Sequence, residues 1–573
     1  MPRPYHAAYR IAPAHRRALF AMLFCIVPGY AWANATTAEP AAPAQSASAS
    51  ASGTNAMQAP ARALPEFYIR EYRVLGAHHL QPVEIENAVY PFLGPGRTAQ
   101  DVEHARAALL KAYEDKQITS VDVVVPPQNG AGGIVFLQVN ELTIGRLRVH
   151  GSRFYDINKI KAHAPSLAEG QLVNFTNAQN DIVNLNQLPD RKITPVIRPG
   201  VLANTMDVDL NVKDTAPLHG SVELNNRYSL DTPDLRTDAS LSYDNLWQLG
   251  HSIGASVETS PQDTNKVAVF TGFYTLRFPD AQGFTLTLQG TKQDSFVSTL
   301  GDVDSVGNGF IIGLRANFKL PTMSDYYQSL TFGIDYKALN QSLFASPDTP
   351  IAFVPLYPYS PTRYMPLSLD YSGTWVEKNS LTDLDLAVVF GIRGIGSSIY
   401  YDDLTRFDAD SNFIYLHGFL SRTQDLPDGF QVFGRVLGQI SDSPLLTSEE
   451  FSAGGVDTVR GYLESEVLGD NAALVNFEFR SPSLLTWFPS LNKSGDKTNE
   501  WRFYFFTDAA TIGIDDALPG QPVRASLASY GGGTHMTIFN HFNGSLDLAV
   551  PLFNQNPTKA QHPFLTFRVW SDF

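Results

Sequence analysis

The chain has almost no cysteine. Cys25 is the only one among its 573 residues, so no disulfide can form within it. Metal-binding patterns are also lacking, because His78 and His79 have no further ligands at metal spacing and no His-Glu-x-x-His pattern occurs. The sequence therefore predicts no metal site and no cofactor.

Basic residues are too few to form a positively charged surface. Lysine and arginine number 42 against 57 aspartate and glutamate residues, which gives a formal net charge of −15. A protein that binds nucleic acid needs clustered lysine and arginine to neutralise phosphates. We therefore expect no nucleic-acid partner.

A run of about 20 apolar residues, the length that a helix needs to cross a bilayer, is also absent. The nearest is "ALFAMLFCIV", residues 18–27, which has basic residues before it and small residues at Ala31, Ala33 and Ala35. This order predicts a secretory signal peptide at residues 1–35, cut after Ala33 or Ala35, so that Cys25 is removed. A membrane anchor is less favoured because Pro28 and Gly29 end the run. A role in a membrane would then require a β-barrel.

Residues 36–65 are rich in alanine, serine and proline, as in "AQSASASASGTNAMQAPARA", and show no apolar periodicity. Such a composition cannot bury enough apolar surface to offset the entropy lost on folding. We expect a disordered linker here.

A repeated pattern follows the linker. "YIREYRVLGAHHL" and "LTIGRLRVHGSRF" share an Arg-Val-x-Gly core at residues 73–76 and 148–151, and each is followed by helical segments and two further strands. In the first unit Thr98 is a helix N-cap, and one face of the helix carries Val102, Ala105, Leu109 and Tyr113. We expect two β-α-α-β-β domains, at residues 66–141 and 142–215.

Residues 216–573 alternate apolar and polar side chains in strand after strand. In "GFTLTLQGT", Phe284, Leu286 and Leu288 fall on one face and threonine and glutamine on the other. A soluble sandwich would alternate as well, but export, the helix-free length and abundant Phe and Tyr favour a lipid-facing barrel. Roughly 16 strands would fit this length. The fold class is mainly β, with a C-terminal transmembrane β-barrel of antiparallel strands after two small α+β domains.

Two short motifs look catalytic but lack the required context. "GHSIG" matches the pattern of a serine hydrolase, yet Ser252 begins an alternating strand instead of a strand-turn-helix elbow. "GPG", Gly94 to Gly96, lacks the strand-to-helix pyrophosphate fingerprint, and we interpret it as a turn before the helix at Thr98. The sequence therefore predicts that the protein is not an enzyme.

The N-terminal repeats resemble polypeptide-transport-associated (POTRA) domains, most closely in "LNQLPDRKITPVIRPG" at residues 185–200. The stretch "GGVDTVRGY" resembles the loop motif of two-partner secretion transporters, carried by Val459, Arg460, Gly461 and Tyr462. In that family the loop folds back into the barrel, where its arginine pairs with the aspartate of a Phe-x-Asp-x-Gly wall motif. The resemblance thus implies a wall partner at Phe506 and Asp508, although Ala510 stands where the family has glycine.

The residue chemistry is compatible with this resemblance. An arginine in a wet lumen can form a forked pair with a carboxylate, and Gly454 and Gly455 allow backbone conformations that other residues resist. The final strand, "PFLTFRVWSDF", has one apolar face and resembles the signal for barrel insertion, although an ordinary closing strand would alternate too. The residues of that face are Leu565, Phe567, Val569 and Phe573.

The resemblance implies an outer-membrane pore with periplasmic N-terminal domains, which recognises an unfolded exoprotein and translocates it to the cell surface. Its expected partners are that exoprotein, outer-membrane lipid and the barrel assembly machinery. Two other functions stay open: an insertase that assembles barrels, and a passive porin.

Overall fold

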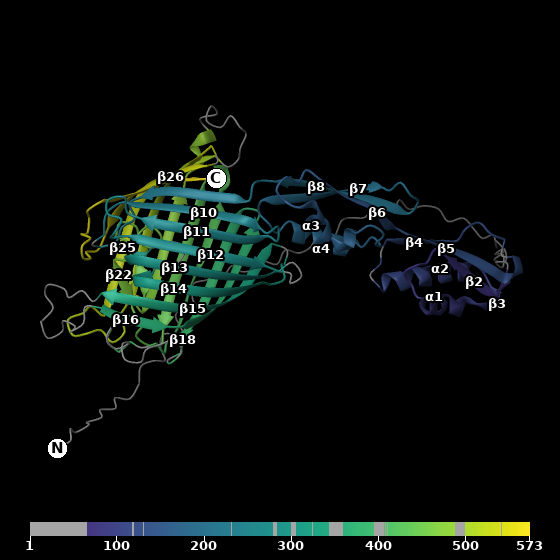
Figure 1. Ribbon diagram of the computed structural model, residues 1–573, viewed down its shortest axis with the longest axis horizontal. Coiled ribbons are helices and arrows are strands. Elements are labelled where there is room, and N and C mark those ends of the chain that lie inside the picture. Colours follow the sequence, from purple (N-terminus) through teal and green to yellow (C-terminus); the bar gives the residue numbers. More distant parts are fainter. Residues whose placement is uncertain are drawn as a thin grey trace, which may run out of the picture. The chain divides into compact units, whose positions relative to one another are not determined.

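A computed structural model describes residues 66–573 of the chain, except 117, 119, 130, 231, 279–282, 299–304, 324, 343–358, 393, 395–405, 407, 410, 487–498 and 540 (Figure 1). The expected signal peptide and linker, residues 1–65, lie outside the described residues. Within the described ranges, no helix is both long and apolar enough to cross a membrane.

The first domain is a three-stranded mixed sheet, in the order β2-β5-β4, packed against two helices. In this sheet β2 pairs parallel with β5, which is the central strand. β1 and β3 form a separate two-stranded sheet. The elements are β1 (Phe67–Ile69), β2 (Glu71–Leu75), α1 (Pro82–Val89), β3 (Gly94–Arg97), α2 (Ala99–Glu114), β4 (Val121–Val124) and β5 (Ile134–Glu141).

Helix α2 begins as the sequence predicts. Thr98 is its N-cap, and the backbone N–H of Thr98 donates to Asp101 Oδ2 at 2.8 Å. The four residues expected on the inner face of the helix are all buried. The turn expected at Gly94 to Gly96 was wrong, because these residues belong to β3. Their positive φ angles, 115° and 67°, let this short strand pair irregularly with β1.

The second domain repeats this topology, with a sheet in the order β6-β8-β7 in which β6 pairs parallel with β8. The predicted β-α-α-β-β repeat is therefore present in both domains. Its elements are β6 (Thr143–His150), α3 (Ile157–Ala162), α4 (Phe175–Leu185), β7 (Arg191–Pro199) and β8 (Thr205–Asp214).

The chain then forms a closed antiparallel barrel, in which the last strand pairs with the first. Ser252 lies in β11, the third strand of the barrel, so "GHSIG" is not part of a strand-turn-helix elbow. The strands are β9 (Leu218–Asn225), β10 (Arg236–Leu246), β11 (His251–Thr259), β12 (Ala268–Arg277), β13 (Phe284–Ser298), β14 (Ser305–Lys319), β15 (Tyr326–Ser342), β16 (Tyr359–Tyr364), β17 (Pro366–Glu377), β18 (Ser380–Gly391), β19 (Ile414–Asp425), β20 (Gln431–Ser441), β23 (Asn471–Arg480), β24 (Glu500–Gly513), β25 (Arg524–Ile538), β26 (Phe542–Pro551) and β27 (Phe564–Asp572).

Two of these elements are halves of one strand. β16 and β17 both pair with β15 in a continuous register, in which Lys337 lies opposite Tyr364 and Ile334 opposite Leu367. The ladder to β15 is interrupted only at Met365 and Pro366. The described barrel thus has sixteen strand positions, which confirms the number estimated from the sequence.

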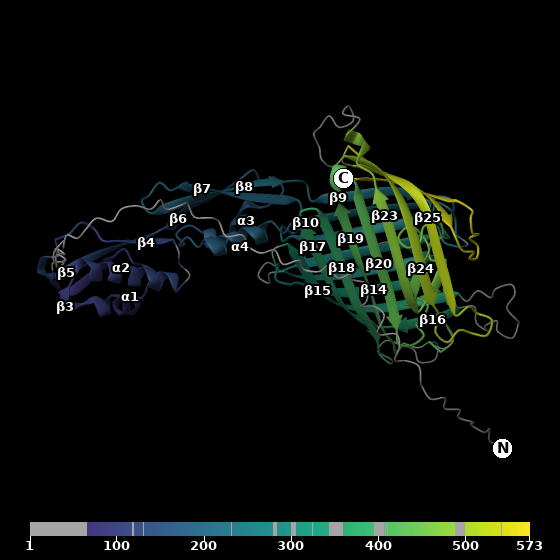
Figure 2. The same cartoon turned by 180° about the vertical axis from the view of Figure 1, so that it is seen from behind.

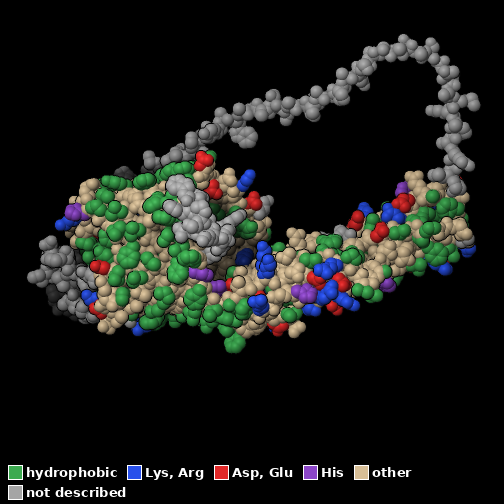
Figure 3. All heavy atoms as spheres, turned by 90° about the horizontal axis from the view of Figure 1, so that it is seen from above, with side chains coloured by type: hydrophobic (Ala, Val, Ile, Leu, Met, Phe, Trp, Pro, Cys, Tyr) green, Lys and Arg blue, Asp and Glu red, His purple; other side chains and the backbone are tan. Residues whose placement is uncertain are grey.

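The outer face of the barrel is apolar and the inner face is polar. Large hydrophobic side chains along the strands are exposed, among them Leu241, Leu288 and Phe477, and Figure 3 shows such side chains spread over the barrel's outer surface. Polar side chains of opposite parity, such as Glu258 and Asp508, are buried inside. A soluble sandwich would expose its polar face to water, so this arrangement identifies a lipid-facing barrel.

The seam between β9 and β27 is the shortest ladder between full strands of the described barrel. It has five residue pairs, from Asn225 opposite Arg568 to Ser221 opposite Asp572. The side chain of Asn226 extends it, because its amide accepts from Phe567 N–H at 2.7 Å and donates to Leu565 C=O at 2.8 Å. One asparagine thus replaces a missing backbone partner.

Candidate functional site

The candidate site is the tip of a loop between β20 and β23, which we call the lumen loop (residues 442–470). A short hairpin, β21 (Phe451–Ala453) paired with β22 (Val467–Gly469), leads to the tip. The tip contacts inner-face residues of the neighbouring strands β23, β24 and β25, which lie side by side in the wall (Figure 2). The loop therefore folds back into the barrel.

Arg460 at the tip is buried against the wall, with 6% of its surface exposed. Its Nε donates to Asp508 Oδ2 and its Nη2 to Asp508 Oδ1, both at 2.8 Å. Its Nη1 donates to Glu478 Oε1 at 2.7 Å, and its guanidinium stacks on the Phe506 ring at 3.6 Å. A planar guanidinium suits this combination of a forked pair and ring stacking, which lysine could not reproduce.

Asp508 is the centre of the wall's polar network and is 1% exposed. Besides the guanidinium, it accepts from the backbone N–H of Arg460 at 3.2 Å and from Asn476 Nδ2 at 2.8 Å. Asn476 lies directly opposite Asp508 in the β23–β24 ladder, and it also donates to the Thr458 carbonyl at 2.6 Å. The buried carboxylate is therefore fully hydrogen-bonded, as a charge away from bulk water requires.

Tyr462 anchors the tip by hydrogen bonds as well as by packing, and Val459 anchors it by packing. The Tyr462 hydroxyl lies 3.1 Å from the carbonyls of both Ala528 and Phe553. Val459 is fully buried in an apolar cluster that also contains Ala510. Alanine at the position where the family has glycine therefore fills space against the loop.

The glycines of the motif are required by geometry. Gly454, Gly455 and Gly461 have φ angles of 111°, 101° and 91°. A Cβ on Gly454 would lie 2.3 Å from the Leu463 carbonyl oxygen, and one on Gly455 would lie 2.0 Å from Glu464 Oε2. Both the turn and the close approach exclude other residues.

Sequence reasoning missed two carboxylates of the tip. Glu464 Oε1 accepts from Arg227 Nε at 2.8 Å, just beyond β9, and Arg227 also pairs with Asp457 at 2.5 Å. Glu466 accepts from the Thr558 hydroxyl at 2.6 Å, between β26 and β27. The only signal in the sequence was a cluster of charges after the motif, which names no partner.

The residues expected to guide insertion lie on the outer face of β27. Leu565, Val569 and Phe573 are about half exposed, and Phe567 is partly buried. Phe573 directly follows β27, and its backbone exchanges hydrogen bonds with Gly220 of β9 at 3.0 and 3.1 Å, which continues the seam by one residue beyond β27. Their role in insertion stays a prediction.

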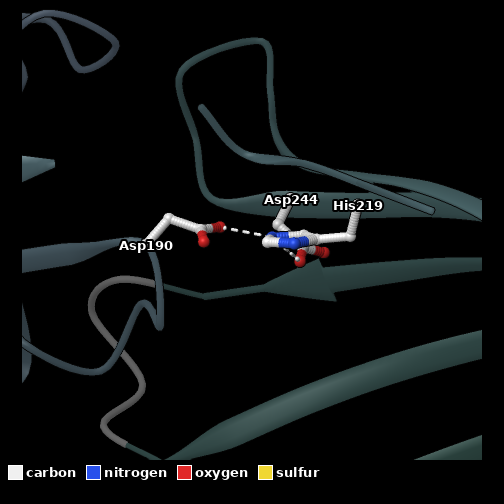
Figure 4. A group of neighbouring side chains, drawn as sticks. All are labelled: Asp190, His219 and Asp244. Atoms are coloured by element: carbon white, nitrogen blue, oxygen red, sulfur yellow. Dashed lines mark hydrogen bonds and ion pairs between the residues drawn. The ribbon is translucent and has the colours of Figure 1, made fainter. Parts of the chain in front are cut away.

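A second polar cluster lies where the chain enters the barrel. His219 Nε2 is 3.0 Å from Asp190 Oδ2 and 3.6 Å from Asp244 Oδ2 (Figure 4). His219 pairs with Ser242 in the β9–β10 ladder, so Asp244 is its diagonal neighbour on the same face. Asp190 comes from the turn before β7, and the cluster therefore connects that turn to the first two strands.

A lipid-facing barrel with a charged loop in its lumen and α+β domains before it defines an outer-membrane β-barrel protein with periplasmic domains. The family model for the haemolysin secretion/activation protein ShlB/FhaC/HecB matches residues 204–509, more than half of the chain. That for the ShlB-type POTRA domain matches residues 67–141. The chain belongs to this family of two-partner secretion transporters, and it lies in the outer membrane with its N-terminal domains in the periplasm.

Individual relatives are distant in sequence. The outer membrane transporter CdiB of Dickeya dadantii (strain 3937) is 20% identical over 366 residues, which is 60% of this chain and 60% of that protein's length. The structure of CdiB from Escherichia coli has a TM-score of 0.59 at 19% identity, covering 91% of this chain and 93% of that one. CdiB from Acinetobacter baumannii has a TM-score of 0.55 at 15% identity, covering 89% and 90%. These similarities show a shared fold.

Proposed function

We propose that this protein moves a large, unfolded exoprotein from the periplasm through its barrel to the cell surface. The observation that carries the proposal is the loop tip held inside the lumen by Arg460 and Asp508. Water can replace the hydrogen bonds of Arg460 when the tip moves, so the apolar contacts of Val459 and Tyr462 are the main ones that release would expose. The tip is thus a removable obstruction, and removing it would widen the path.

The N-terminal domains would deliver the exoprotein. Each mixed sheet has edge strands, β4 in the first domain and β7 in the second. An edge strand offers unpaired N–H and C=O groups, to which an extended chain can add as a further strand. The protein itself would enter the membrane through the barrel assembly machinery, guided by the apolar face of β27, and would contact lipid through its outer surface.

Secretion by a deletion strain tests the proposal. The strain is complemented with the parent chain, with Arg460→Ala, or with Arg315→Ala, and the export of large exoproteins to the cell surface and medium is measured. Arg315 is a matched control, because it forms a forked inner-face pair with Asp335 at 2.7 Å and has no hydrogen bond or ion pair to the lumen loop among the described residues. We expect Arg315→Ala to restore export and Arg460→Ala to restore little of it.

Two results would contradict the proposal. Continued export of every large exoprotein by the deletion strain would leave a passive porin as the better description. Loss of many unrelated barrels from the outer membrane would favour an insertase. Planar-bilayer conductance of the purified chain shows separately whether each variant still forms a pore.

A further inference from the structure

A basic cavity lies at the periplasmic mouth of the barrel, where β12 and β14 end. Its volume is about 340 Å³, and helices of the second domain line its other side. The basic side chains of its lining are Lys159, His163, Arg191, Arg277 and Lys319. This volume can hold one side chain or a small ligand.

The two acidic residues of the lining are already engaged by their own domain. Asp156 accepts from the N–H of Asn158 at 2.7 Å as the N-cap of α3. Asp181 accepts from the backbone and hydroxyl of Ser166 at 2.9 and 2.5 Å. The neighbouring Asp190 and Asp244 both point toward the His219 ring (Figure 4). Four lysine and arginine side chains line the cavity against these two carboxylates, so the lining keeps a net positive charge.

Arg277 is the clearest sign of a missing partner. Its Nε is enclosed and has no hydrogen-bond partner among the described residues. In the same part of the chain, no acidic side chain forms an ion pair with Arg277 or with Lys319. An enclosed guanidinium N–H without an acceptor is costly, and an oxyanion would satisfy it.

The side chains face the lumen instead of the lipid. Arg277 lies opposite Thr285, which lies opposite Asn317, and Lys319 is two residues further along the same face. The alternate positions carry Phe284 and Phe318, whose rings contact each other at 4.8 Å on the outer face. A lipid keeps its acyl chains in the bilayer, so its headgroup could reach these inward-facing side chains only by passing through the barrel wall. A ligand inside the lumen is therefore favoured.

We propose that Arg277 and Lys319 form a binding site for a carboxylate of an extended acidic peptide that enters the barrel. This inference rests on the proposed function and specifies its substrate chemistry. Acidic side chains of the exoprotein would bind transiently at this site as the chain enters the barrel. Lys159 of α3 would contribute positive charge from the periplasmic side.

Block of the pore by a peptide tests the site in the full chain. The protein is placed in phosphatidylcholine bilayers, and hexaglutamate or hexaglutamine is added on the side of the N-terminal domains. We expect hexaglutamate to block the current at about tenfold lower concentration than hexaglutamine, because charge-assisted hydrogen bonds are the stronger ones. The double variant Arg277→Gln/Lys319→Gln should remove this difference.

Arg422→Gln is the matched control. Arg422 is another cation near the periplasmic mouth, but its charge is already paired with Glu377 at 3.2 Å. We expect this variant to keep the parent's preference for hexaglutamate. The proposed site would be contradicted if hexaglutamate blocked the parent and the double variant at the same concentration. It would also be contradicted if Arg422→Gln lost the preference for hexaglutamate as completely as the double variant.

Two further outcomes separate the competing explanations. If phosphatidylglycerol in the bilayer abolished the block, an anionic lipid would occupy the site and the peptide assignment would fail. If the block persisted as expected while the deletion strain still exported every exoprotein, the peptide site would stand and the proposed function would fail.

Discussion

Asp508 receives three hydrogen bonds from Arg460, two from the guanidinium and one from the backbone N–H. The contact therefore fixes the main chain of the loop as well as a side chain. The third nitrogen of the guanidinium, Nη1, donates to Glu478. The pair is one part of a larger network, and this determines how it responds to mutation.

Exchange of the two charges should not restore function. In Arg460→Asp/Asp508→Arg, the new aspartate would face Glu478, and the new arginine would face the donors of Asn476 and of the loop backbone. Breaking one partner of a buried pair costs about 3–5 kcal/mol. We expect the open fraction of the channel in planar bilayers to be as high in the double variant as in Arg460→Ala.

Adding Glu478→Gln to the charge exchange removes one of the two repulsions and serves as the comparison. The triple variant should have a lower open fraction of the channel than the double variant. Complete recovery by the simple exchange would contradict the network described here, because it would mean that only the sign of the two charges matters.

Gly454→Ala should loosen the loop tip. The residue has a φ of 111°, and a Cβ would lie 2.3 Å from the Leu463 carbonyl oxygen. A left-handed conformation costs about 1–2 kcal/mol for other residues, and the close contact adds to this. Hydrogen exchange of the lumen loop should become faster. Gly434→Ala in β20 is the control, because a Cβ there meets no atom within 4 Å; similar exchange in both variants would disprove the steric argument.

Asn226→Ala should weaken the seam between β9 and β27. The substitution leaves Phe567 N–H and Leu565 C=O without their partner, at about 1–3 kcal/mol for each group that water cannot reach. Hydrogen exchange at Phe567 should be faster than in the parent. Asn317→Ala, which removes hydrogen bonds to wall hydroxyls within the long β14–β15 ladder, should leave exchange at Phe567 unchanged.

Glu141 should make the first domain sensitive to acid. Burial alone would raise the pKa of this carboxyl, but hydrogen bonds from His79, Tyr113 and two backbone N–H groups outweigh burial and lower the pKa below its ordinary value of 4.5. A lowered folded-state pKa stabilises the domain fully above about pH 4.5, and this contribution is lost as the pH falls through the folded-state value.

Hydrogen exchange of β5 in the full chain measures this effect. Protection in the parent should fall as the pH is lowered from 6 to about 3, after correction for the intrinsic exchange rate. Glu141→Gln should be less protected at pH 6 and should depend much less on pH. Parallel pH profiles for the two proteins would assign the acid sensitivity to other groups.

The sequence predicted the elements whose signals are local. Two-residue alternation identified the barrel strands, and the Arg-Val-x-Gly repeat identified the two domains. The contact of Arg460 with Asp508 followed only from the family resemblance. The sequence could not identify Asn476 and Glu478 as partners of the loop, because polar residues at all inner-face positions give the same pattern until the strand register is known. It could not identify Arg227 either, because this residue lies after β9 and outside the alternating pattern. The split of one strand at Met365 was not predicted, although the following Pro366 has no backbone N–H to donate to the ladder.

Glu464 and Glu466 give the loop a consequence for the shape of the barrel. Arg227, the partner of Glu464, follows the first strand, and Thr558, the partner of Glu466, precedes the last. The loop tip therefore links the two ends of the rolled sheet across its shortest ladder. Widening the barrel at that joint would require the tip to release either Arg227 or Thr558.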